Sequence, residues 1–337
     1  MYPSVTQDIA SRNEADVAGQ LPLNELQIAV LIPCYNEVVT IAQVVRDFRR
    51  ELPSALIYVY DNNSSDGTAA AAAAAGAVVE HEPFQGKGHV VRRMFSDIDA
   101  DIYVLVDGDS TYDAAAAPHM IAKLIDDHLD LVNGVRRSSQ QEAYRLGHRF
   151  GNLMLTALVA RGFGRRTTDM LTGYRVFSRR FVKSFPSLTS GFEIETEIIV
   201  HALELKMLMA DFETAYGGRP EGSESKLSTV RDGMRILRTI GVLIKEERPL
   251  AFFGMVSVVL LLAAVAIFVP VYIEYHQTGL VRRFPTTILA TGMVLASALS
   301  MACGLILSTV TLGRREMKRL IYLQQPRITA KLRRAAQ

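Results

Sequence analysis

The sequence contains no tryptophan, only two cysteines and little excess charge of either sign. Cys34 and Cys303 lie far apart, so we expect neither a disulfide nor a cysteine-based metal site, which fits a reducing compartment. A formal net charge of +2 over 337 residues does not predict a nucleic-acid-binding protein. Residues 1–24 are polar and lack the apolar stretch of a signal peptide, so a flexible leader is expected there.

Short apolar segments alternate with helical patterns in the first half of the chain. The runs 27–32, 56–60, 77–80 and 102–106 predict buried strands, and the segments between them predict helices. This alternation predicts an α/β domain over 25–225 with a mostly parallel, doubly wound sheet. Ligands of such sheets bind beyond the carboxyl ends of the strands.

Polar clusters stand at three of these strand ends, namely Tyr35-Asn36-Glu37, residues 61–66 and Asp107-Gly108-Asp109. Asp107 and Asp109 are the strongest candidates for chemistry, because two carboxylates this close repel unless a cation lies between them. Oxygen ligands favour Mg²⁺ or Mn²⁺, and such a metal would neutralise charge on a leaving diphosphate. The sequence therefore predicts a metal site here, with a solvated acidic turn as the alternative.

Further candidates have weaker signals. Gly86-Lys87-Gly88 precedes a predicted helix, where glycine backbone and a lysine favour anion binding, although a plain turn has the same pattern. Asp169 could orient an acceptor, position Arg175 or cap local structure. Several basic residues precede this segment, and they suit a phosphate ligand or a solvated face. The basic residues are Arg136, Arg137, Arg145, His148 and Arg149. Among Glu193, Glu195 and Glu197 we expect one functional carboxylate on an otherwise solvated helix, with a general base as one interpretation of it.

The loop 217–226 is rich in glycine and serine and carries Arg219 and Lys226. These two basic residues are placed to close over a diphosphate, and the same loop would serve as a linker to the next segment.

Two uncharged segments, 250–273 and 285–313, follow the predicted domain. Each is long enough to cross a hydrocarbon core of about 30 Å, so we expect a transmembrane hairpin over 250–313. Buried core helices are the alternative. Small residues in the second span either pack the hairpin on itself or support homo-oligomerisation. They are Ala290, Gly292, Ala296 and Ala298.

The distribution of basic residues predicts the orientation of this hairpin. Segment 226–248 carries six Lys or Arg, the tail 314–337 carries eight, and the hairpin loop carries two. Positive charge favours the cytoplasmic side, so the protein is predicted to be an integral membrane protein with its α/β domain and both termini in the cytoplasm. Segment 226–248 is amphipathic and is predicted to lie on the membrane as a juxtamembrane helix, and residues 314–337 are predicted to form a basic cytoplasmic tail.

Taken in order, the motifs resemble those of family 2 glycosyltransferases. The segments that carry the resemblance are Pro33-Cys34-Tyr35-Asn36-Glu37, 61–68, Gly86-Lys87-Gly88 and Asp107-Gly108-Asp109. Residues 168–177, Arg219 and Ser225-Lys226-Leu227 narrow it to the dolichol-phosphate mannosyltransferase and polyprenyl-phosphate glycosyltransferase subgroup. The resemblance covers about 30–230, and the hairpin also suits that subgroup.

The resemblance implies a GT-A fold and an inverting transfer from a UDP- or GDP-sugar to a polyprenyl or dolichyl phosphate, with Mg²⁺ or Mn²⁺ as cofactor. The residues implied for the nucleotide-sugar are Pro33, Tyr35, Glu37, Asp61, Lys87, Gly108, Arg219 and Lys226. Asp107 and Asp109 would hold the metal on the donor diphosphate. Asp169 is implied as a catalytic residue, and Arg136, Arg149 and Arg175 as ligands of the acceptor phosphate.

One departure and two alternatives stay open. The family often has two acids where this chain has Asp61-Asn62, which leaves uracil and guanine as candidate bases. A processive polysaccharide synthase would need more transmembrane helices and a Gln-x-x-Arg-Trp motif, and this sequence has no tryptophan. A non-catalytic nucleotide-sugar-binding membrane protein would not need the paired acids.

Overall fold

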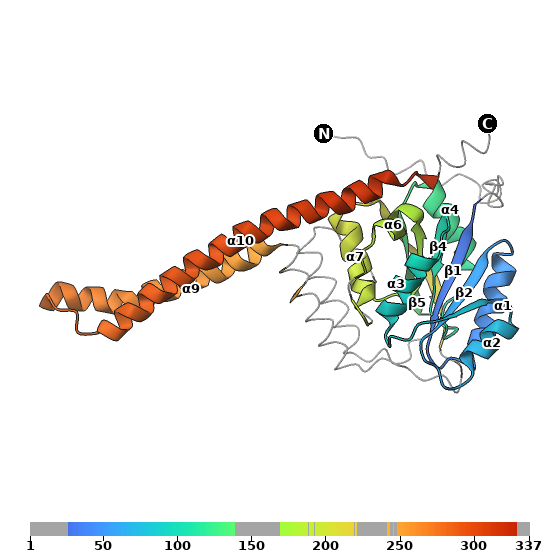
Figure 1. The fold of residues 1–337 in the computed structure, drawn as a ribbon, viewed down its shortest axis with the longest axis horizontal. Helices are drawn as coiled ribbons and strands as arrows, with labels where there is room; N and C mark the ends of the chain where they lie inside the picture. Colours follow the sequence, from blue (N-terminus) through green and yellow to red (C-terminus); the bar gives the residue numbers. More distant parts are fainter. Residues whose placement is uncertain are drawn as a thin grey trace.

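In the computed structural model, the described residues are 26–138, 169–187, 189–191, 193–218, 220, 241–242, 245 and 248–328. The predicted leader and most of the predicted juxtamembrane helix lie outside them. Arg149, Arg219 and Lys226 lie outside them as well. The described chain forms an α/β domain from which a long helical hairpin projects (Figure 1).

A seven-stranded sheet runs through the described part of the domain in the order β3-β2-β1-β4-β6-β5-β7. Its strands are β1 (Ile28–Cys34), β2 (Leu56–Asp61), β3 (Val78–His81), β4 (Ile102–Leu105), β5 (Leu131–Ser138), β6 (Arg175–Ser178) and β7 (Met209–Tyr216). β1 pairs in parallel with β2 and β4, β2 with β3, and β5 with β7, while β6 runs antiparallel between β4 and β5. The mostly parallel sheet expected from the sequence is therefore confirmed.

Helices cover both faces of this sheet. One apolar core lies under α1 (Ile41–Glu51), α2 (Thr68–Ala74) and α4 (Ala116–Asp126). The other lies under α3 (Lys87–Asp97), α6 (Arg179–Ser184) and α7 (Ile194–Glu204). α2 uses the alanine run that predicted a helix, and it ends before Gly76, whose φ of 93° is a left-handed conformation that glycine adopts without strain.

The register of the strands brings several of their ends to one edge. Cys34 at the end of β1 pairs with Asp61 at the end of β2, and Asp61 pairs in turn with His81 at the end of β3. Leu31 pairs with Leu105, so the residues that follow β4 leave the sheet beside the end of β1. The polar clusters predicted after β1, β2 and β4 thus lie at one edge.

The hairpin consists of α9 (Pro249–Thr278) and α10 (Phe284–Gln324), both long and apolar enough to cross a membrane. In the most apolar window of each helix only 11% of the residues are buried, which argues against the alternative of two soluble core helices. Apart from Pro249 at the start of α9, the buried positions repeat every seven residues, as in a left-handed helix pair. They are Ser257, Ala264 and Val271 on α9, and Ala290, Ser297, Gly304 and Thr311 on α10.

Small and hydroxylated residues join the two helices. Ser297 Oγ donates to the Ser257 carbonyl at 2.8 Å and lies 2.9 Å from Ser257 Oγ. A side chain at Gly304 would approach Phe253 Cβ at 3.0 Å, so this glycine allows the helices to come close. Of the small residues noted in the sequence, Ala290 is buried in this contact, whereas Gly292, Ala296 and Ala298 are exposed.

α10 extends well beyond the predicted second span, which ended at residue 313. Its last two turns reach back to the α/β domain, where Lys318 Nζ lies 2.7 Å from Glu204 Oε2 on α7. Tyr322 donates its hydroxyl hydrogen to Asp130 Oδ2 at 2.6 Å and stacks under Arg180, 3.8 Å from the ring centroid. The first part of the predicted basic tail over 314–337 is thus a continuation of α10, and its charged and aromatic side chains have partners on the domain.

Candidate active site

The loop after β4 presents the paired acids. Gly108 lies between them, and a side chain there would approach Cys34 Sγ at 2.7 Å, so a larger residue would displace either the loop or the Cys34 side chain. Thr40 donates its hydroxyl hydrogen to the Gly108 carbonyl at 2.7 Å and fixes the loop against the start of α1. Both acids are thereby held at the carboxyl edge of the sheet.

This edge is strongly acidic. Burial raises the pKa of the Cys34 thiol, and the negative charges of four carboxylates raise it further. The four are Glu37, Asp61, Asp107 and Asp109. Carboxylates that converge in this way are stabilised by a cation, whether a basic side chain or a metal ion.

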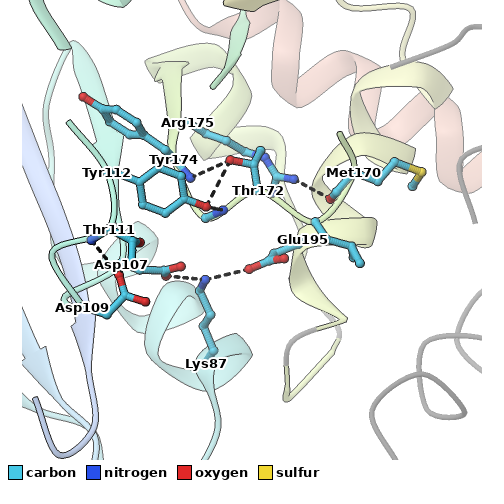
Figure 2. A network of polar contacts seen from close by, with 12 residues as sticks. Lys87, Asp107, Asp109, Thr111, Tyr112, Met170, Thr172, Tyr174, Arg175 and Glu195 are labelled. Atoms are coloured by element: carbon cyan, nitrogen blue, oxygen red, sulfur yellow. Dashed lines mark hydrogen bonds and ion pairs between the residues drawn. The ribbon is translucent and has the colours of Figure 1, made fainter. Parts of the chain in front are cut away.

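Lys87 is the cation that the structure places there. It begins α3, and its buried Nζ lies 2.6 Å from Asp107 Oδ1 and 2.7 Å from Glu195 Oε1 on α7 (Figure 2). Burial alone would lower the pKa of Lys87, but the two carboxylates outweigh it and raise this pKa above its usual value. Lys87 therefore stays charged and joins three elements at the predicted metal site.

Asp107 and Asp109 point to different partners. The Asp107 side chain is 29% exposed and lies against the Gly173 backbone, where an added Cβ would be 2.5 Å from its Cγ. Asp109 is buried, and its Oδ1 accepts hydrogen bonds from the Thr111 backbone at 3.2 Å and the Thr111 hydroxyl at 2.6 Å. Asp107 thus offers the accessible carboxylate of the pair.

A divalent cation fits this donor set. Within the described residues, no three His, Cys, Asp or Glu side chains are grouped so that they could enclose a metal ion. Two carboxylates leave most of an octahedral shell to water and substrate oxygens, which is how Mg²⁺ is usually held beside phosphates. Asp107 and Asp109 could therefore hold such an ion only together with a substrate or water.

The turns after β1 and β2 form a connected wall next to these acids. Asn36 accepts from the Ser65 backbone at 2.9 Å, and its own N–H donates to Ser64 Oγ at 2.8 Å. Asp61 is buried, with one oxygen accepting from the Ser64 backbone at 3.1 Å and the other without a hydrogen bond among the described residues. Glu37 is buried as well, whereas Tyr35 is 39% exposed and Pro33 partly so.

Asp169, Arg136 and Arg175 lie on the other side of β4. Arg136 makes a bidentate ion pair with Asp169, at 2.7 and 2.9 Å. Arg175 is fully buried, and its guanidinium donates to Asn133 Oδ1 at 2.9 Å and to the Met170 carbonyl at 2.8 Å. Complete burial lowers the pKa of Arg175 from its usual value. In this state Arg175 supports the 169–171 segment from inside, and its predicted contact with an acceptor stays a prediction.

The three glutamates before and in α7 differ from expectation. All three are buried, so the expected solvated helix is wrong. Glu195 contacts Lys87, while Glu197 accepts from the Thr189 backbone and hydroxyl at 3.0 and 2.7 Å. The sequence could have predicted this burial, because apolar residues occur on every side of α7 and such a helix belongs in a core.

Comparison with known proteins identifies the family. The profile described as Glycosyl transferase family 2 matches residues 29–185. Glycosyltransferase AglJ of Haloferax volcanii is 30% identical over 88% of this chain and 98% of its own length. The chain belongs to glycosyl transferase family 2. Protein RfbJ of Shigella flexneri is 58% identical over 37% of this chain and 98% of its own.

The fold is shared with solved structures. Glucosyl-3-phosphoglycerate synthase from Mycobacterium tuberculosis, solved with Mn²⁺, UDP and glucosyl-3-phosphoglycerate, superposes with a TM-score of 0.55 at 21% identity. The match covers 65% of this chain and 81% of that one. The α/β domain therefore has the GT-A-type fold, and the protein is a glycosyltransferase with two apolar C-terminal helices.

Proposed function

We propose that this glycosyltransferase moves a sugar, with inversion, from a UDP- or GDP-sugar to a polyprenyl or dolichyl phosphate at the cytoplasmic face of a membrane. The observation that carries the proposal is that one chain contains both an acidic site at the strand ends and an apolar hairpin. An acidic strand-end site with a buried lysine lies in the GT-A domain, and α10 joins this domain directly to an apolar hairpin.

The donor half of the proposal is supported by the wall of the site. The buried Asp61 oxygen that lacks a hydrogen bond among the described residues is suited to accept one from a nucleobase. A related fold binds UDP and Mn²⁺ in the mycobacterial synthase. Asp107 and Asp109 would hold Mg²⁺ or Mn²⁺, which supplies positive charge to the departing nucleoside diphosphate. Lys87 adds a second positive charge beside Asp107.

The acceptor half is supported by chemistry and by charge. A phosphate monoester is already anionic near neutral pH, so it needs positioning more than a strong base. Asp169 is held by Arg136 at 2.7 Å, which suits an orienting role for this pair rather than a free base. The lipid phosphate oxygen forms the new bond to the anomeric carbon as the bond from that carbon to the nucleoside diphosphate breaks.

The proposed membrane location is supported by the hairpin and by the charge of the segments that flank it. The side chains of α9 and α10 are mostly exposed and apolar, a surface that lipid would cover. The excess of Lys and Arg in 226–248 and 314–337 favours a cytoplasmic position for both flanks.

A transfer assay tests the proposal. The purified full chain is incubated with radiolabelled UDP- and GDP-sugars, Mn²⁺ and a short polyprenyl phosphate, and label is measured in the organic phase. We expect label from one donor and none when polyprenol replaces its phosphate. Transfer to polyprenol or to a water-soluble acceptor alone would refute the lipid-phosphate assignment.

A further inference from the structure

Asn62 follows β2 and is buried, and its side chain is occupied by the segment that leads to Lys87. Its amide nitrogen donates to the carbonyls of Glu82 and Phe84, both at 2.8 Å. Its amide oxygen accepts from the Gly86 backbone at 2.7 Å. One side chain thus holds three backbone groups of the segment 82–86.

The opposite side of the same segment lies against the chain before α7. The Gly88 backbone donates to the Ser190 carbonyl at 3.0 Å. A side chain at Gly88 would lie 2.8 Å from the Ser190 carbonyl carbon, so no larger residue fits between the two backbones. The segment 82–88 is therefore held from both sides, by Asn62 and by Ser190.

The residue between these two supports is Lys87. Its buried ammonium group reaches Asp107 and Glu195 at 2.6 and 2.7 Å, so a small displacement of the 82–88 segment would break both contacts. A buried charged group that loses a hydrogen-bond partner is left unpaired, which costs more than the hydrogen bond itself contributed.

We propose that Asn62 is a positioning residue that sets Lys87 against Asp107 by latching the 82–86 backbone, and that it does not bind the nucleobase. The inference rests on the proposed donor site. It also accounts for the departure from two acids at Asp61-Asn62. An aspartate at this position could not donate to the two carbonyls and would place one carboxylate oxygen 2.8 Å from each of them.

The test uses Asn62→Asp, which keeps the shape, and Asn62→Ala, which removes the amide without adding charge. Ser65→Asp is the control, because Ser65 is exposed on the same turn and the same charge is added there, whereas the Asn63 amide itself donates to the Pro83 carbonyl at 3.0 Å. The first readout is the rate at which an amine-acylating reagent modifies Lys87, measured by mass spectrometry with thermal unfolding as a check on folding. We expect about tenfold faster modification in both Asn62 variants, as loss of roughly 1.4 kcal/mol of protection predicts, and no change in the control. Equal protection of Lys87 in a folded Asn62 variant overturns the proposal.

The second readout is the affinity for UDP or GDP with Mn²⁺, measured by calorimetry in the wild type, Asn62→Asp, Lys87→Met and the double variant. We expect each single change to weaken binding about tenfold and the double change to add less than twofold, because Asn62 acts through Lys87. Additive losses would overturn the proposal. If the wild-type chain binds neither UDP nor GDP, the proposed function is refuted. The modification rates of Lys87 would still test the role of Asn62.

Discussion

Gly173 offers the sharpest test of how the site is built. It lies against the Asp107 carboxylate, and the Cβ of an alanine there would be 2.5 Å from Asp107 Cγ. Ordinary van der Waals contact begins at 3.4 Å, and Asp107 Oδ2 would lie closer to the added Cβ than Cγ does, so Asp107 or the 172–174 backbone must move by more than about 0.9 Å. Either movement separates Asp107 from Lys87 or from the position of a bound metal.

The expected size of the effect follows from this displacement. A misplacement of about 1 Å at a reacting centre costs roughly 100-fold in rate, equivalent to about 2.7 kcal/mol at the transition state. Overpacking at a tight position also lowers the free energy of unfolding by about 1–3 kcal/mol. We therefore expect Gly173→Ala to fold, to melt a few degrees lower and to lose about 99% of its transfer activity.

The assay is the initial rate of sugar transfer at saturating donor, with a circular dichroism melt on the same sample. Gly218→Ala is the control, since a Cβ at Gly218 would meet nothing within 4 Å. Wild-type activity in Gly173→Ala, with an unchanged requirement for metal, would refute the position assigned to Asp107.

Three further outcomes are expected. Asp107→Ala should abolish transfer and Mn²⁺-dependent nucleotide binding in calorimetry, and substantial residual activity would refute the metal assignment. Burial, reinforced by the charge of Lys318, lowers the pKa of His201 to about 3, so its ring is neutral in the folded domain and stability falls as pH drops below about 6.5 towards 3. Between pH 7 and 5 this loss amounts to about 2 kcal/mol, and urea unfolding of His201→Gln should show a decrease smaller by that amount; an identical decrease would contradict the burial of His201. Tyr322→Phe removes the 2.6 Å bond to Asp130 and should cost about 1.5–3 kcal/mol in thermal stability, whereas Tyr275→Phe on the exposed end of α9 should cost nothing; equal melting temperatures for the two would argue against docking of α10.

The sequence predicted those parts of the fold that depend on neighbours along the chain. Apolar runs defined β1 to β4 within two residues, and the polar strand ends predicted where Asp61, Asp107 and Asp109 would gather. These features are local, because a short apolar run must be buried and the turn after it must be polar. Lys87 was also found this way, from the two glycines that flank it.

The missed contacts depend on residues far apart in sequence. Glu195 lies 108 positions from Lys87, and no spacing rule distinguishes it from Glu193 and Glu197. Gly173 supports Asp107 only because β6 runs antiparallel beside β4. Lys318 and Tyr322 are four residues apart and therefore lie on one face of α10, where both contact the α/β domain. Counting the basic residues of the tail did not reveal this face.

With the hairpin in a membrane, as proposed, the unbroken course of α10 would couple the lipid environment to the enzyme. One helix packs along α9 and continues without interruption to the ion pair with Glu204. In a thinner or thicker bilayer a hairpin changes its tilt. A rigid lever of this length would carry that tilt to the catalytic domain and swing the acidic edge of the sheet towards or away from the head groups. Membrane thickness would then set how readily the site meets its lipid.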